Sequence, residues 1–197
     1  MIVLGIDPGY GRVGYGVIDY TKNKYKAIEY GSITTEANTP LPKRLHKIEL
    51  ELRGIISRYK IDAVSIEDLY FNNNSKTAIK VAEARGVILN TIESEGIPIY
   101  EYTPLQAKLA IVGYGRAEKI QVKNMVKEFL RLDKMPKLDD TTDALAIAIC
   151  HTNSYRLNSF VEKWINFMLT VAFFYYMWYN KNVGVEIYYF KNFWKDD

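Results

Sequence analysis

Residues 1–9 read MIVLGIDPG, an apolar run that ends in Asp7 and is followed at once by a proline–glycine pair. An apolar run of this length, bounded by turn residues, is typical of a strand buried on both faces of a sheet. Residues 63–67 read AVSIE and repeat the pattern, with Glu67 at the end. We therefore expect a sheet in which two buried strands each bring one carboxylate to the surface.

Two further carboxylates occur late in the chain. Asp140 and Asp143 open the apolar run ALAIAI at residues 144–149, and a three-residue spacing places both on one face of a helix. If the fold gathers Asp7, Glu67, Asp140 and Asp143, their mutual repulsion in a partly desolvated pocket has to be offset. Divalent cations with oxygen ligands offset it directly, and Mg²⁺ is the natural choice.

The chemistry expected of such a site is phosphodiester hydrolysis. Two Mg²⁺ ions about 3.5–4 Å apart can activate a water on one side of a phosphodiester and stabilise the leaving oxygen on the other. No protein nucleophile is then required. With one Cys and two His in the whole chain, a thiolate site or a His-rich zinc site is disfavoured. The residues thus favour metal-assisted hydrolysis over acyl transfer or redox chemistry.

A simpler interpretation of the same acids stays open from the residues alone. An isolated aspartate at a strand end is commonly a turn or helix cap, and Asp139 and Asp140 could likewise cap the final core helix. Gly9 and Gly11 suit either a tight turn or close approach of the backbone to a phosphate. A carboxylate metal site needs acids at strand ends together with an acidic pair on a late helix, and this chain has both.

The remaining pattern predicts an α/β domain. Strands come first, and strands and helices alternate afterwards, which indicates a mixed sheet with flanking helices. The helix after Pro40 carries apolar residues at helical spacing, and the small residues of the next helix suit either core packing or close approach of another helix. The predicted strands are 2–6, 13–19, 25–34, 63–67 and 98–102, and the predicted helices are 41–59, 75–93, 104–112, 117–131 and 139–151.

Four segments, in this order and at this spacing, resemble the crossover (Holliday) junction endodeoxyribonuclease RuvC family over about residues 1–151. The segments are GIDPG at 5–9, IE at 66–67 through AEARG at 82–86, VGYGRAEK at 112–119 and DTTDALAIA at 140–148. The resemblance implies a ribonuclease H-like fold. It also assigns the catalytic metal ligands, which are Asp7, Glu67, Asp140 and Asp143.

The same resemblance implies three DNA-binding residues. Tyr70 aligns with an aromatic residue, usually Phe, that the family places at the junction centre, where a ring can stack on a base. Lys108 and Lys119 align with lysines that the family uses on DNA, where they would bind phosphates without reading sequence. From the residues alone, burial of Tyr70 and ordinary surface positions for both lysines stay open.

Partners are also implied by the resemblance. They are four-way junction DNA, a second copy of the chain joined through the helix at 75–93, and a branch-migration helicase complex. The formal charge of +3 is too small to indicate a nucleic-acid partner by itself. Between residues 101 and 137, however, eight Lys or Arg stand against four Asp or Glu, which predicts one basic face.

Cellular context and the last core helix give three smaller expectations. No basic leader precedes the first apolar strand, so we expect a cytoplasmic protein without a membrane partner. Cys150 lies in an apolar stretch and has no second cysteine to pair with, which predicts a reduced, buried thiol. His151 is expected to end the last core helix, with either a packing role or an interaction with the helix dipole.

Residues 152–197 depart from the family and are expected to form an accessory extension to a nuclease domain at residues 1–151. Residues 164–179 are sixteen uncharged positions rich in aromatics, and a second aromatic patch follows at 187–194. Sixteen residues are few for a membrane span, which needs about 20, although Tyr and Trp can lie at membrane interfaces. An added helix, an unstructured or frame-shifted extension and a membrane anchor all stay open.

The sequence thus predicts a Mg²⁺-dependent, structure-selective DNA endonuclease that acts as a homodimer and nicks two opposing strands of a four-way junction in recombination and repair. One alternative is a ribonuclease H-like nuclease that acts on another nucleic acid. A second is a junction-binding protein that does not cut, against which the complete acid set argues. A third is an actin-like ATPase, which would need a second phosphate loop and a much longer chain.

Overall fold

The computed structural model describes residues 1–68 and 75–183, and the chain divides into two compact units, residues 1–154 and residues 155–197. Tyr70 and the aromatic patch at residues 187–194 lie outside the described residues. The sheet and every candidate site residue that the structure describes belong to the first unit.

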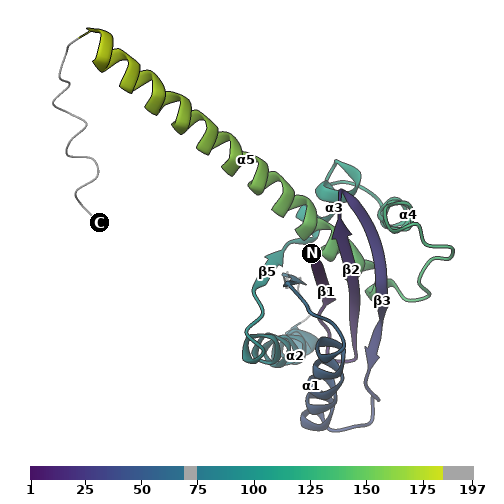
Figure 1. The fold of residues 1–197 in the computed structure, drawn as a ribbon. Helices are drawn as coiled ribbons and strands as arrows, with labels where there is room; N and C mark the ends of the chain where they lie inside the picture. The colour runs from purple at the N-terminus through teal and green to yellow at the C-terminus, as the bar shows by residue number, and fades with distance from the viewer. Residues whose placement is uncertain (69–74, 184–197) are drawn as a thin grey trace. The chain divides into compact units, whose positions relative to one another are not determined.

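The first unit is built on a five-stranded mixed sheet with the strand order β3-β2-β1-β4-β5 (Figure 1). Its strands are β1 (Ile2–Asp7), β2 (Arg12–Thr21), β3 (Lys24–Thr34), β4 (Ala63–Glu67) and β5 (Ile99–Tyr102). The first three strands form an antiparallel meander, whereas β4 runs parallel to both β1 and β5. The predicted mixed sheet is therefore confirmed.

Helices cover both faces of this sheet. They are α1 (Leu41–Ser57), α2 (Ser75–Ser94), α3 (Pro104–Val112), α4 (Lys119–Leu130) and α5 (Asp139–Val183). Because side chains alternate along a strand, Leu4 and Ile6 of β1 pack with α1 and α2, and Val3 packs with α3, α4 and the start of α5. The first unit is thus a three-layer α/β structure with one hydrophobic core on each side of the sheet.

The last helix is longer than the sequence predicted. We expected it to end at His151, but α5 continues to Val183, because no Gly or Pro occurs between residue 139 and Gly184 to stop it. His151 is only 2% exposed, and its Nδ1 lies 2.9 Å from the hydroxyl of Tyr102. The expected role at a helix terminus is therefore wrong, and the packing role is confirmed. Cys150 is a buried free thiol, as predicted.

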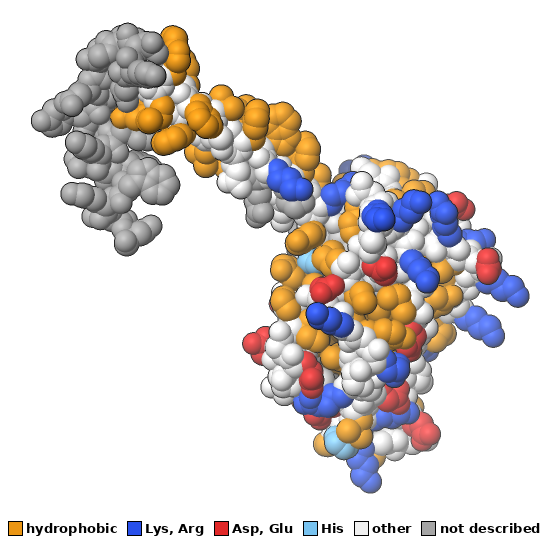
Figure 2. Space-filling model, viewed as in Figure 1, with side chains coloured by type: hydrophobic (Ala, Val, Ile, Leu, Met, Phe, Trp, Pro, Cys, Tyr) orange, Lys and Arg blue, Asp and Glu red, His pale blue; other side chains and the backbone are white. Residues whose placement is uncertain are grey.

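The second unit is helical as far as it is described. Its large apolar side chains face solvent, and Figure 2 shows apolar side chains in orange along this segment. Examples are Phe167, which is 58% exposed, and Phe174, which is 67% exposed. Within residues 1–68 and 75–183, no helix has the combined length and apolarity that a membrane crossing requires.

Candidate active site

Strand alternation brings Asp7 and Glu67 together. In the parallel pair β1–β4, Ile6 lies opposite Ile66, and both are buried in the core shared with α1 and α2. The next residue on each strand therefore points to the opposite face, which is the face covered by α5. The carboxyl groups of Asp7 and Glu67 lie close enough there for each to affect the pKa of the other.

Glycines in β1 and β2 let the start of α5 approach this pair closely. Gly14 pairs with Asp7 across the β1–β2 ladder, and a Cβ added to Gly14 would lie 1.9 Å from the carbonyl oxygen of Asp140. Added Cβ atoms on Gly5 and Gly16 would also meet α5, at 2.0 and 2.5 Å. Only residues without a side chain allow this contact. No local pattern in the sequence predicts this role for Gly14 or Gly16.

The four carboxylates interact electrostatically. Burial raises the pKa of Asp7 well above its ordinary value, repulsion by Glu67 raises it further, and Asp143 and Asp140 add to the effect. Burial likewise raises the pKa of Glu67 and of Asp143. The fold has thus placed four acids where the negative charge is not fully compensated.

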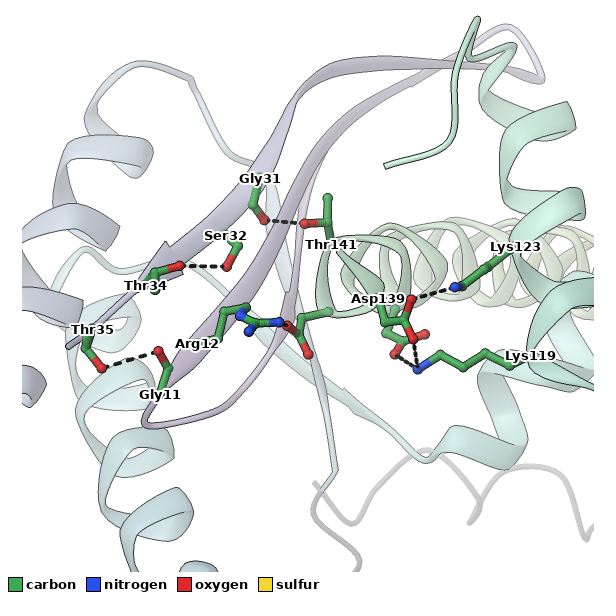
Figure 3. A network of polar contacts seen from close by, with 12 residues as sticks. Gly11, Arg12, Gly31, Ser32, Thr34, Thr35, Lys119, Lys123, Asp139 and Thr141 are labelled. Carbon is green, nitrogen blue, oxygen red and sulfur yellow. Dashed lines mark hydrogen bonds and ion pairs between the residues drawn. The ribbon is translucent and has the colours of Figure 1, made fainter. Parts of the chain in front are cut away.

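Basic side chains pair with the two candidate ligands on α5, Asp140 and Asp143. Arg12 donates from Nη1 to Oδ2 of Asp140 at 2.9 Å, and Nζ of Lys119 lies 3.1 Å from Oδ2 of Asp143. Figure 3 shows Arg12 reaching from the start of β2 and Lys119 reaching from α4. In the part of the chain that the structure describes, no three Asp, Glu, His or Cys side chains are grouped so as to hold a metal ion.

The side chain of Asp139 has different partners from that of Asp140, its neighbour in sequence. It pairs with Lys119 at 3.2 Å and with Lys123 at 2.5 Å (Figure 3), and hydrogen bonds from Lys123 and Lys119 lower its pKa. Asp140 acts on Asp7, whereas Asp139 is directed toward α4. This difference favours Asp140 over Asp139 as the partner of Asp7.

A small hollow beside the acids contains both lysines implied by the family resemblance. Its volume is about 180 Å³, and its charged lining consists of Glu67, Asp143, Lys108 and Lys119. The apolar part of its lining comprises Pro104, Ala107, Val122, Ala146 and Ile147. In Figure 2, Lys and Arg side chains also gather over the part of the first unit where Figure 1 places α4. A phosphate could therefore be held next to the carboxylates.

Two features of the site were not found from the sequence. Arg12 was not a candidate because 128 residues separate it from Asp140, and no local pattern marks such a pair. Lys123 was not a candidate because a lysine on a helix is normally a solvated surface residue. Tyr70 lies outside the described residues, so its junction-stacking role stays a prediction.

The donor chemistry of the site fits a hard divalent cation. Carboxylate oxygens are the ligands that Mg²⁺ prefers, and burial together with repulsion between carboxylates raises the pKa of Asp7, Glu67 and Asp143, an effect that a cation would offset. The residues that would hold Mg²⁺ are Asp7, Glu67, Asp140 and Asp143.

Comparisons with known proteins agree on one family. The family model described as crossover junction endodeoxyribonuclease RuvC matches residues 3–151. The protein of that name from Syntrophomonas wolfei is 54% identical over 162 residues, which is 82% of this chain and 94% of the relative. The relative from Clostridioides difficile is 54% identical over 157 residues, 80% of this chain and 93% of its own length.

Solved structures give the same result. The structure described as T. thermophilus RuvC in complex with Holliday junction substrate has a TM-score of 0.77 and 33% identity, and the match covers 80% of this chain and 96% of that one. The yeast mitochondrial Holliday junction resolvase, at a TM-score of 0.58, 13% identity and coverage of 82% and 83%, shares the fold alone. From this fold and these matches, the chain belongs to the RuvC family of crossover junction endodeoxyribonucleases.

Proposed function

We propose that this family member resolves four-way DNA junctions at an active site formed by Asp7, Glu67, Asp140 and Asp143 with two Mg²⁺ ions. The observation that carries the proposal is that Glu67, Asp143 and Asp140 all act electrostatically on Asp7 at the end of β1, beside a hollow lined by lysines. The family membership supports the substrate, since a relative of 33% identity is described with a Holliday junction.

Each residue has a physical role in this proposal. Bound Mg²⁺ would supply an activated water and stabilisation of the leaving oxygen. A bound cation would favour the charged forms of Asp7 and Glu67, because it stabilises carboxylates. Lys108 and Lys119 bind backbone phosphate next to the acids and position the strand without reading its sequence.

A homodimer is part of the proposal, because two sites are needed to nick two opposing strands. The outer face of α2 supports it. Ile79 on that face is 68% exposed, Ala82 and Gly86 are exposed on the same side, and a Cβ on Gly86 would meet nothing within 4 Å. Small and apolar residues at helical spacing allow a second helix to approach closely. Contacts with a branch-migration helicase and a cytoplasmic location rest on family membership.

The test is cleavage by purified full-length protein of three substrates, each with Mg²⁺ or with a chelator. The substrates are a synthetic four-way DNA junction, a matched duplex and an RNA–DNA hybrid. We expect paired nicks in the junction that require Mg²⁺. The Asp7→Asn variant should lose most cleavage and keep junction binding, because it loses a charged ligand while repulsion of phosphate falls. Preferred cleavage of the RNA–DNA hybrid would favour a ribonuclease H-like nuclease that acts on another nucleic acid. Junction binding without nicking would favour a junction-binding protein that does not cut.

We also propose that residues 152–197 are accessory. Every described candidate ligand and DNA-binding lysine lies in residues 1–151, and the first compact unit ends at Ser154. Truncation after Asn153 should therefore leave a folded, Mg²⁺-dependent resolvase. A truncated protein that folds and dimerises normally but cannot cut junctions would contradict this.

A further inference from the structure

We propose that Arg12 is a resident counter-ion of Asp140, which a metal ion has to displace before that carboxylate can act as a ligand. The inference rests on the proposed function, because it takes Asp140 to be a metal ligand. It concerns a residue that neither the sequence pattern nor the family resemblance assigned to the site.

The contact itself is well formed. Nη1 of Arg12 donates to Oδ2 of Asp140 at 2.9 Å, which is the length of a charge-assisted hydrogen bond. Arg12 is the first residue of β2, and Asp140 is the second residue of α5. Figure 3 shows the guanidinium extended from the strand toward the start of the helix. Arg12 is therefore bound to the carboxylate of Asp140, which the proposed function requires as a ligand of the cation.

The pair is placed so that it can open. The side chains of Arg12 and Asp140 are 46% and 32% exposed, so the guanidinium can turn into water without leaving a buried charge behind. Exposed ion pairs of this kind contribute little to folding. A divalent cation bound by the same carboxylate would lie within a few ångströms of the guanidinium, and like charges at that distance repel.

Lys119 differs from Arg12 because it has two carboxylate partners. It contacts Asp139 at 3.2 Å as well as Asp143 at 3.1 Å, so it keeps one carboxylate partner if a metal ion takes the other. Among the described residues, Asp140 is the one carboxylate with which Arg12 pairs. Competition with metal is therefore expected to be strongest at Arg12.

The test is a Mn²⁺ titration of the full chain, with free Mn²⁺ measured by electron paramagnetic resonance. The Arg12→Gln variant should bind Mn²⁺ about 3- to 10-fold more tightly than wild type, because the competing charge is removed. Arg12→Lys should stay close to wild type. Arg53→Gln is the matched control, because Arg53 pairs with Glu49 and Glu95 instead, and it should not change Mn²⁺ affinity.

A second readout is the rise in melting temperature on adding Mn²⁺, which should be larger for Arg12→Gln than for wild type at the same Mn²⁺ concentration. Unchanged or weaker Mn²⁺ binding by folded Arg12→Gln would overturn this inference alone, provided that wild type binds Mn²⁺ and Asp7→Asn binds it less. Absence of Mn²⁺ binding to wild type would overturn the proposed metal site and this inference together.

Discussion

Replacement of Gly14 by alanine tests how the active site is assembled. An added Cβ would lie 1.9 Å from the carbonyl oxygen of Asp140, 2.3 Å from its carbonyl carbon and 3.0 Å from the backbone nitrogen of Thr141. All three obstacles are backbone atoms, so no side-chain rotation can relieve the clash. The first turn of α5 has to move away from β2.

The size of the effect follows from these distances. Cβ atoms essentially never approach closer than 3.0 Å, so the carbonyl of Asp140 must retreat by about 1.1 Å from its present distance of 1.9 Å. Overpacking of this kind costs about 1–3 kcal/mol, which corresponds to a fall in melting temperature of about 4–8 °C at 2 kcal/mol. A displacement of about 1 Å in a catalytic group can lower the rate about 100-fold.

The assay combines thermal unfolding with single-turnover cleavage of a four-way junction in Mg²⁺. Gly54→Ala is the matched control, because it also adds one methyl group but its nearest neighbour, the Arg58 side chain, lies at 3.9 Å. That change removes a glycine from the interior of α1 and should stabilise the protein by about 0.5–1 kcal/mol without affecting cleavage. A Gly14→Ala protein with wild-type melting temperature and cleavage rate would refute the close-approach argument.

Three further predictions concern the acids, the lysines and the buried histidine. Asp140→Asn should slow junction cleavage about 100-fold or more, whereas Asp139→Asn should stay within about 10-fold of wild type; the reverse order in single-turnover assays would show that the wrong neighbour was chosen. Lys108→Ala should weaken junction binding, and the slope of log affinity against log salt concentration should become shallower by about 1, as measured by fluorescence anisotropy in Ca²⁺. Unchanged binding would show that Lys108 is an ordinary surface lysine. Burial lowers the pKa of His151 from 6.5 to about 4, so the unfolded state binds a proton more readily than the folded state. The free energy of unfolding should therefore fall as the pH drops from about 6.5 toward 4, with a loss of about 2 kcal/mol at pH 5. Urea unfolding at pH 7.5 and 5 should show this loss in wild type and a smaller loss in His151→Gln; equal losses would contradict it.

The strands and their acids could be predicted because the signals are local. The strand at residues 63–67 has the predicted bounds, and β1 extends only one residue further than expected. The start of α5 was predicted correctly from the acidic pair and the apolar run after it, but its end was not. The family resemblance ends near His151, whereas the helix continues because no Gly or Pro occurs before Gly184. Tyr70 could not be compared, since it lies outside the described residues.

The alternation of side chains along a strand and the end of a strand are properties of a few consecutive residues. The sequence alone therefore determined that Asp7 and Glu67 lie at strand ends outside the core. It also determined that Asp140 and Asp143 share a helix face. Only the tertiary structure decided which charges they meet. Arg12 pairs with Asp140, which lies 128 residues later in the chain. Gly14 allows close approach of the α5 backbone at the same Asp140. Such contacts depend on the packing of a helix against a sheet, and the distance between two backbones is not encoded in any local pattern of residues.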